Sequence, residues 1–172
     1  MKLINSVTVG AGGTTSVNFT SIPADYTDLV ILISARSGSA GDILWMRFNS
    51  DASTICTILW LNGDGSTPTS GTLAGNAFLR LGTITSGDTA NTFTNFRVDI
   101  PNYAGSAQKT MNSETVNENN GTTAHQRITA GIWPVTTAIS SITISNNGSS
   151  ISQHTTAYLY GITKGSGGAT VS

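Results

Sequence analysis

The sequence predicts an all-β protein, an antiparallel β-sandwich of the jelly-roll type. Two observations carry this prediction. Apolar and polar residues alternate in most apolar segments, and this period of two is the pattern of a strand rather than of a helix. Turn sequences rich in Asn, Asp and Gly separate the segments at roughly the 8 to 12 residue spacing of antiparallel sandwiches. We therefore expect two sheets that bury their apolar faces against each other.

The first strands differ in their expected burial. Residues 29–33, LVILI, are apolar at every position, which predicts a central strand buried on both faces. Residues 43–48 alternate, with Leu44, Met46 and Phe48 on one face, and this pattern is typical of a half-buried strand. In chain order, strands are predicted at residues 14–20, 29–36, 43–48, 55–61, 77–82, 93–100, 110–118, 126–133, 139–145 and 154–162.

The later strands repeat the period of two. The apolar sets on one face are Phe96, Val98 and Ile100, then Ile128, Ala130 and Ile132, then Ile142 and Ile144, and then Tyr158, Tyr160 and Ile162. We expect these faces to supply the core of the sandwich. The turns are predicted at residues 62–65, 86–88, 119–121 and 146–148, where Asn, Asp and Gly tolerate positive φ.

A chain of 172 residues is long enough for one well-cored domain and short for two. The sequence predicts a single β-sandwich domain over residues 1–172. Flexible tails are expected at residues 1–13 and 164–172, because both are rich in Gly and small polar residues. We expect the C-terminal tail, KGSGGATVS, to become ordered only in contact with a neighbouring molecule.

The composition restricts the possible partners. Only 10% of the residues are charged, against roughly 25% in ordinary soluble domains, and the formal net charge is -1. Nucleic acids and anionic membranes attract clustered Lys and Arg, so neither partner is expected. A surface with so little repulsive charge suits a homo-oligomer, for which we predict a trimer, or attachment to a larger assembly. No apolar run approaches a membrane span, and no secretory signal follows Met1.

No catalytic, cofactor-binding or metal-binding residue is predicted. Ser106 and Lys109 match S-x-x-K, but they follow a turn and not the start of a helix, so we expect no catalytic pair. His125 and His154 belong to no cluster with metal-ligand spacing, and the single Cys56 is expected to be a small buried hydrophobe. We therefore predict that the protein is not an enzyme. A glycan depolymerase would need a pair of carboxylates, and no such pair is evident.

Two further patterns have structural interpretations. Residues 62–66, NGDGS, resemble the start of a calcium loop, but Thr67 replaces the required Gly and Leu73 the required Glu, so a turn is expected. Glu114 and Glu118 would pair on a helix, whereas on the predicted strand they belong to a solvated edge. A sugar-stacking platform would need exposed aromatic residues, but packing is the expected role of Trp45, Trp60, Trp133, Tyr103, Tyr158 and Tyr160.

Several phrases together resemble a family of small virion proteins of tailed bacteriophages. They are IPADYTDLVILISARS at residues 22–37, MRFN at 46–49, NTF at 91–93, IPNYAGS at 100–106, SETVNENN at 113–120 and AYLYGI at 157–162. The resemblance implies a jelly-roll-like structural module on the outer surface of the phage particle, with no catalytic residues. We expect a capsid decoration (cement) protein that binds the major capsid protein or other virion proteins and stabilises the assembled shell. The alternative is a head-fibre or tail adhesin that recognises a host surface glycan.

Overall fold

A computed structural model describes residues 1–39, 42–84, 87–117, 124–146 and 148–163. The strands are β1 (Lys2–Thr8), β2 (Ser16–Phe19), β3 (Asp28–Ala35), β4 (Asp42–Phe48), β5 (Cys56–Gly63), β6 (Thr69–Asn76), β7 (Leu79–Ile84), β8 (Thr94–Pro101), β9 (Lys109–Asn117), β10 (His125–Trp133), β11 (Ile142–Asn146) and β12 (Thr156–Ile162). The predicted all-β sandwich is confirmed. The described residues include no helix that is long and apolar enough to cross a membrane.

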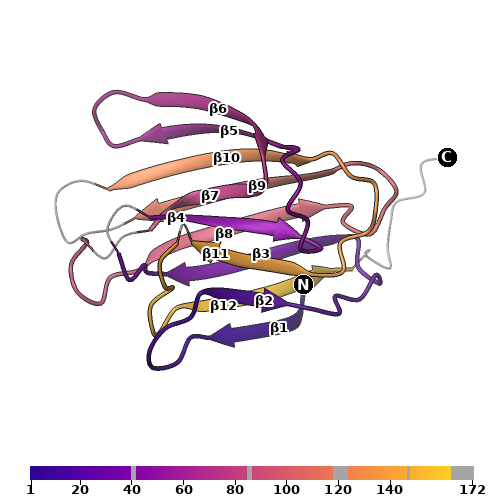
Figure 1. Cartoon of the computed structure of the whole chain (residues 1–172), viewed down its shortest axis with the longest axis horizontal. Coiled ribbons are helices and arrows are strands. Elements are labelled where there is room, and N and C mark those ends of the chain that lie inside the picture. The colour runs from indigo at the N-terminus through magenta and orange to yellow at the C-terminus, as the bar shows by residue number, and fades with distance from the viewer. Residues whose placement is uncertain (40–41, 85–86, 118–123, 147, 164–172) are drawn as a thin grey trace.

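The strands form two antiparallel sheets whose order is that of an enlarged jelly roll (Figure 1). The larger sheet has the order β1-β12-β3-β8-β9-β10-β5-β6, and the smaller one has the order β2-β11-β4-β7. In the usual lettering of a jelly roll the two sheets are BIDG and CHEF. The smaller sheet matches BIDG strand for strand, and β3, β5 and β6 take the places of C, E and F. Three strands, β8 to β10, fill the place of H, and their odd number preserves the direction of β3 relative to β5.

The hydrophobic core lies between the sheets, and most of the predicted faces supply it. Leu29, Val30 and Ile31 are completely buried in β3, which lies inside the larger sheet between β12 and β8, as predicted. Leu44, Met46 and Phe48 of β4 also point inward. The predicted inward faces of β8 and β11 are likewise buried, with Phe96, Val98, Ile100, Ile142 and Ile144.

Strand β10 has the opposite orientation to the one that its sequence suggests. Ile128 and Ile132 are 41% and 40% exposed, whereas Thr129 and Trp133 are buried against the core. The expectation that the isoleucine face of this strand contributes to the core is therefore wrong. The physical reason is that Trp133 buries far more apolar surface than an isoleucine, and that Gly131 leaves room for Leu79 of the facing sheet and for Met111 of the neighbouring strand β9.

Two strands form where the sequence predicts none. Residues 2–8 form β1, which pairs with β12, so the prediction of a flexible tail over residues 1–13 is wrong for this part. A shift of register between Leu3 and Asn5 breaks the period of two, which hides the strand in the sequence. Strand β6 contains two glycines and one large apolar residue, Leu73, so its sequence looks like a loop. The C-terminal tail at residues 164–172 lies outside the described residues.

Candidate functional site

The structure does not pair Ser106 with Lys109. Ser106 is exposed in the turn before β9, whereas Lys109 begins β9 and is completely buried. The Lys109 ammonium donates to the carbonyl oxygens of Gly105 at 2.6 Å and Thr136 at 3.2 Å, and also to that of Ala107. Burial lowers the pKa of this ammonium group. Lys109 therefore fastens the turn before β9 to the segment after β10.

The two histidines lie in different parts of the larger sheet. His125 begins β10 and His154 lies in the turn before β12, with β3, β8 and β9 between these strands. Within the part of the chain that the structure describes, no three His, Cys, Asp or Glu side chains are grouped so as to hold a metal ion. The thiol of Cys56 is buried, and this burial raises its pKa to about 11.

Asp64 closes the start of the β5–β6 connection, where the sequence resembles the beginning of a calcium loop. Its Oδ1 atom accepts hydrogen bonds from the Ser66 backbone N–H at 2.9 Å and from the Ser66 hydroxyl at 2.7 Å. These hydrogen bonds lower the pKa of the Asp64 carboxyl group. Gly65 has φ of +84°, which glycine adopts without strain. Of the two glutamates considered, Glu114 is exposed on β9, and Glu118 lies outside the described residues.

The aromatic residues form no single platform. Tyr103 and Trp133 are buried in the core, so packing is their role. Tyr158 and Tyr160 of β12 point to the outer face of the larger sheet, opposite the buried Ala157 and Leu159. The expectation that the Tyr158, Tyr160 and Ile162 face supplies the core is therefore wrong, because the other face of β12 packs into the core through Leu159. Trp45 contacts Phe78 with ring centroids 3.8 Å apart, and Trp60 is half-buried on β5.

The outer face of the larger sheet carries an apolar surface on β5 and β10. Leu61 pairs across the strands with Ile128, and Leu59 pairs with Ala130. Leu59 and Leu61 are 52% and 59% exposed. We call Leu59, Leu61, Ile128, Ala130 and Ile132 the β5–β10 patch. A shallow groove of about 520 Å³ runs beside it toward the edge strand β6.

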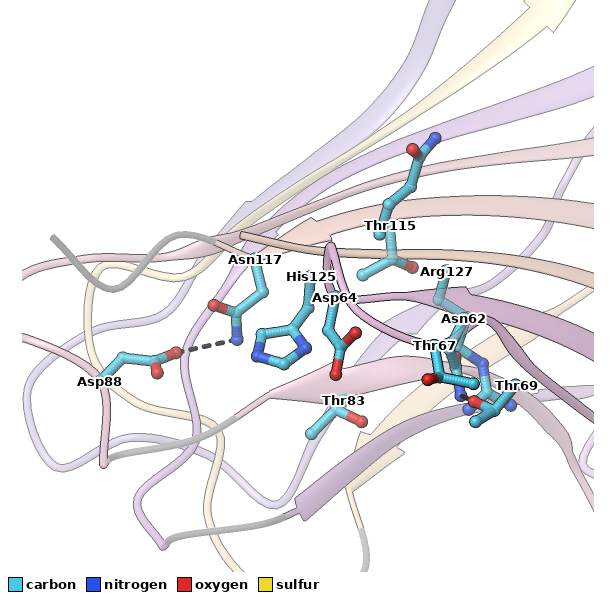
Figure 2. Close-up of a pocket in the computed structure, with 11 residues that line it drawn as sticks. Asn62, Asp64, Thr67, Thr69, Thr83, Asp88, Thr115, Asn117, His125 and Arg127 are labelled. Atoms are coloured by element: carbon cyan, nitrogen blue, oxygen red, sulfur yellow. Dashed lines mark hydrogen bonds between the residues drawn. The ribbon is translucent and has the colours of Figure 1, made fainter. Parts of the chain in front are cut away.

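A pocket of about 440 Å³ opens at the end of the sandwich where β5, β9 and β10 carry polar residues (Figure 2). Its lining residues are Asn62, Asp64, Thr67, Thr69, Thr83, Asp88, Thr115, Asn117, His125, Gln126 and Arg127. The amide of Asn117 donates to the Asp88 carboxylate at 2.9 Å. We call this cavity the end pocket. The end pocket brings together Asn62 and Asp64, from the segment that resembles a calcium loop, and His125, which the sequence analysis considered separately.

Arg127 is the cation of the end pocket, and packing fixes its position. Its Nε atom donates to the Thr129 hydroxyl at 3.0 Å, and its guanidinium carbon lies 4.9 Å from the centre of the Trp60 ring. The Nη2 atom is buried and has no hydrogen-bond partner among the described residues. Burial, and to a smaller extent the charge of Arg80, lowers the pKa of Arg127. The guanidinium therefore has donor capacity that no described residue uses.

Comparison with known proteins adds no family. No family model, curated protein or solved structure matches the chain.

The sequence held a signal for the end pocket. Asn62, Thr115, Asn117 and Arg127 occupy inward-facing positions of their strands, where core residues are expected. The signal was missed because the direction of β10 was assigned from its isoleucines. Asp88 could not have been found in this way, because it lies in the loop between β7 and β8.

Proposed function

We propose that the protein is a structural component of a phage particle, a decoration protein that binds the outside of the capsid and stabilises the closed shell. The observation that carries this proposal is the β5–β10 patch, together with the resemblance of the sequence to small phage virion proteins. Strand β10 turns its isoleucines to solvent although its other face borders the core. Exposed apolar groups gathered on one face are typical of an interaction surface.

The composition of the patch favours a permanent partner. The patch has no charged residue, and its edge beside β6 carries Ser70 and Thr72. Burial of apolar surface contributes roughly 25 cal/mol per Å². Ordering and association costs offset much of that gain, so one copy binds modestly. Many copies that bind the assembled shell and not its free subunits together shift the equilibrium toward the closed capsid.

The number of copies in each virion tests the assignment to the shell. A decoration protein is repeated over the capsid surface, so quantitative mass spectrometry of purified virions is expected to find hundreds of copies. A few to a few tens of copies would contradict the decoration role and favour a fibre or tail component, which is the alternative that the sequence left open.

Substitution in the patch tests the surface. Leu61→Asp places a charge in the middle of the patch without touching the core, so the protein should fold normally and lose most of its retention on purified particles. Leu3→Asp is the matched control, because Leu3 is 49% exposed on the same sheet but lies on its opposite edge. Retention of the Leu61→Asp variant at the wild-type level would exclude the patch as the attachment surface.

A further inference from the structure

We propose that the end pocket binds a neutral saccharide. This inference rests on the cavity between β5, β9 and β10 and does not depend on the capsid role of the chain. The cavity, at about 440 Å³, falls within the range of roughly 300 to 1,000 Å³ that is usual for small-molecule sites. Its lining is polar, whereas most of the residues buried between the two sheets are apolar.

The pocket is lined by polar residues at inward positions of β9 and β10, and one of them, Arg127, has a buried atom whose hydrogen-bond partner a ligand can supply. Thr115 and Asn117 continue the inward series of β9 that begins with buried residues such as Met111, and Arg127 continues the inward series of β10 from Trp133. A buried polar group without a partner costs about 1–3 kcal/mol. The Arg127 Nη2 atom is such a group within the described part of the chain. A cavity filled by a ligand rich in hydroxyl groups offers partners for these side chains.

The charges around the pocket select a neutral ligand. Asp64 and Asp88 line it from the two loops, and Figure 2 shows the Asp64 carboxylate near the His125 ring. Two carboxylates repel an anion, and the positive charge of Arg127 offsets part of their attraction for a cation. The remaining lining residues are amides and hydroxyls, which both donate and accept hydrogen bonds. A sugar hydroxyl also does both, so a polyhydroxylated neutral molecule fits this combination.

Local packing prepares the site before any ligand arrives. Two hydrogen bonds from Ser66 hold Oδ1 of Asp64 in place. The Trp60 ring packs against the Arg127 guanidinium, and the Thr129 hydroxyl accepts a hydrogen bond from its Nε atom. These contacts reduce the ordering cost that a ligand must overcome. Trp60 is thus a positioning residue, since it acts on the pocket through Arg127.

The test is titration of the isotope-labelled full-length chain with four neutral sugars, namely galactose, glucose, mannose and N-acetylglucosamine, at millimolar concentrations. At least one should shift the backbone amide resonances of Asn117, His125 and Arg127 in two-dimensional NMR spectra. Asp64→Asn keeps the Oδ1 acceptor of the turn but removes the charge, and Asn62→Ala removes an amide. Each should weaken binding about tenfold, which corresponds to about 1.4 kcal/mol.

The matched control is Asp51→Asn. Asp51 accepts a hydrogen bond from the backbone N–H of Ser53 at 2.9 Å, as Asp64 does from Ser66, but it lies beside Trp133 at the other end of β10. This variant should bind like the wild type. N-acetylneuraminic acid and glucosamine, as charged sugars, should bind more weakly than the neutral ones. The proposal is overturned if no neutral sugar shifts the pocket amides, if Asp51→Asn weakens binding as much as Asp64→Asn, or if the charged sugars bind equally well.

Discussion

The hydroxyl group of Tyr103 forms hydrogen bonds with the segment that leads into β3. The ring is completely buried, and the hydroxyl donates to the Pro23 carbonyl and accepts from the Tyr26 backbone N–H at 3.4 Å. Burial raises the pKa of this hydroxyl, which therefore stays protonated as the donor. Both contacts cross to a segment distant in sequence. The side chain thus ties the turn after β8 to the segment before β3.

Tyr103→Phe is expected to destabilise the protein by about 0.5–1.5 kcal/mol, because the hydrogen bond from the buried tyrosine to the carbonyl of the exposed Pro23 is lost. Urea denaturation followed by circular dichroism measures the change. The matched control is Tyr158→Phe, since the Tyr158 ring is 38% exposed, and a surface change of this kind is expected to stay within about 0.5 kcal/mol. Equal stabilities for the two variants would show that the Tyr103 hydroxyl contributes nothing.

The Asp51 carboxyl group makes the stability of the folded protein depend on pH. Hydrogen bonds from Ser53, and then from the Trp133 ring N–H at 2.7 Å, lower the pKa of the Asp51 carboxyl group in the folded state. In the unfolded state the pKa of an aspartate is about 3.9. The contribution of the Asp51 carboxylate to stability is therefore complete above that pH and is lost as the pH falls through the lower pKa of the folded state. The stability difference between wild type and Asp51→Asn should therefore disappear on acidification. Urea denaturation at a series of pH values measures it, and a constant difference would contradict this origin.

At the scale of the elements, the period of two predicts where strands lie but does not decide which face is buried. For β4, β8 and β11 one face is clearly more apolar, and the prediction of the buried face was correct. For β10 both faces have apolar residues, and the choice depends on the fit of Trp133 and Gly131 against the facing sheet, which no local pattern contains. Placing Arg127 in the end pocket depends on the same choice, so this residue could not be assigned before the direction of β10 was known, although the polar inward residues of β5 and β9 were a signal for the pocket.

The β5–β6 hairpin offers a matched pair of glycines. A Cβ atom on Gly71 would lie 2.7 Å from Cη2 and 2.8 Å from Cε2 of the Trp60 ring, whereas a Cβ on Gly63 meets no atom within 4 Å. Gly71→Ala must displace the rigid indole, so we expect a loss of about 1–3 kcal/mol, and Gly63→Ala should change stability little. Thermal unfolding of both variants measures this. Similar melting temperatures for the two would show that the indole moves freely.

At the scale of the whole molecule, the low charge of the surface acts together with the exposed apolar face. With eight basic and nine acidic residues in 172, like-charge repulsion between copies is weak. The free protein should therefore self-associate, with a trimer as the expected species. Sedimentation equilibrium over a range of concentrations measures the mass, and a strictly monomeric protein at every concentration would contradict this prediction.

The proposed decoration role predicts that stabilisation of the shell depends on the concentration of the free protein. A ligand that binds only the assembled state contributes RT ln(1 + [L]/Kd), so the contribution grows with the logarithm of the free protein concentration. Particles stripped of the protein should release their DNA at a lower temperature, and added purified protein should restore the release temperature progressively. Leu3→Asp should restore it like the wild type, whereas Leu61→Asp should not, because its charge must be buried against the capsid without a partner. A release temperature that is independent of added wild-type protein would leave the β5–β10 patch without a role in stabilising the shell.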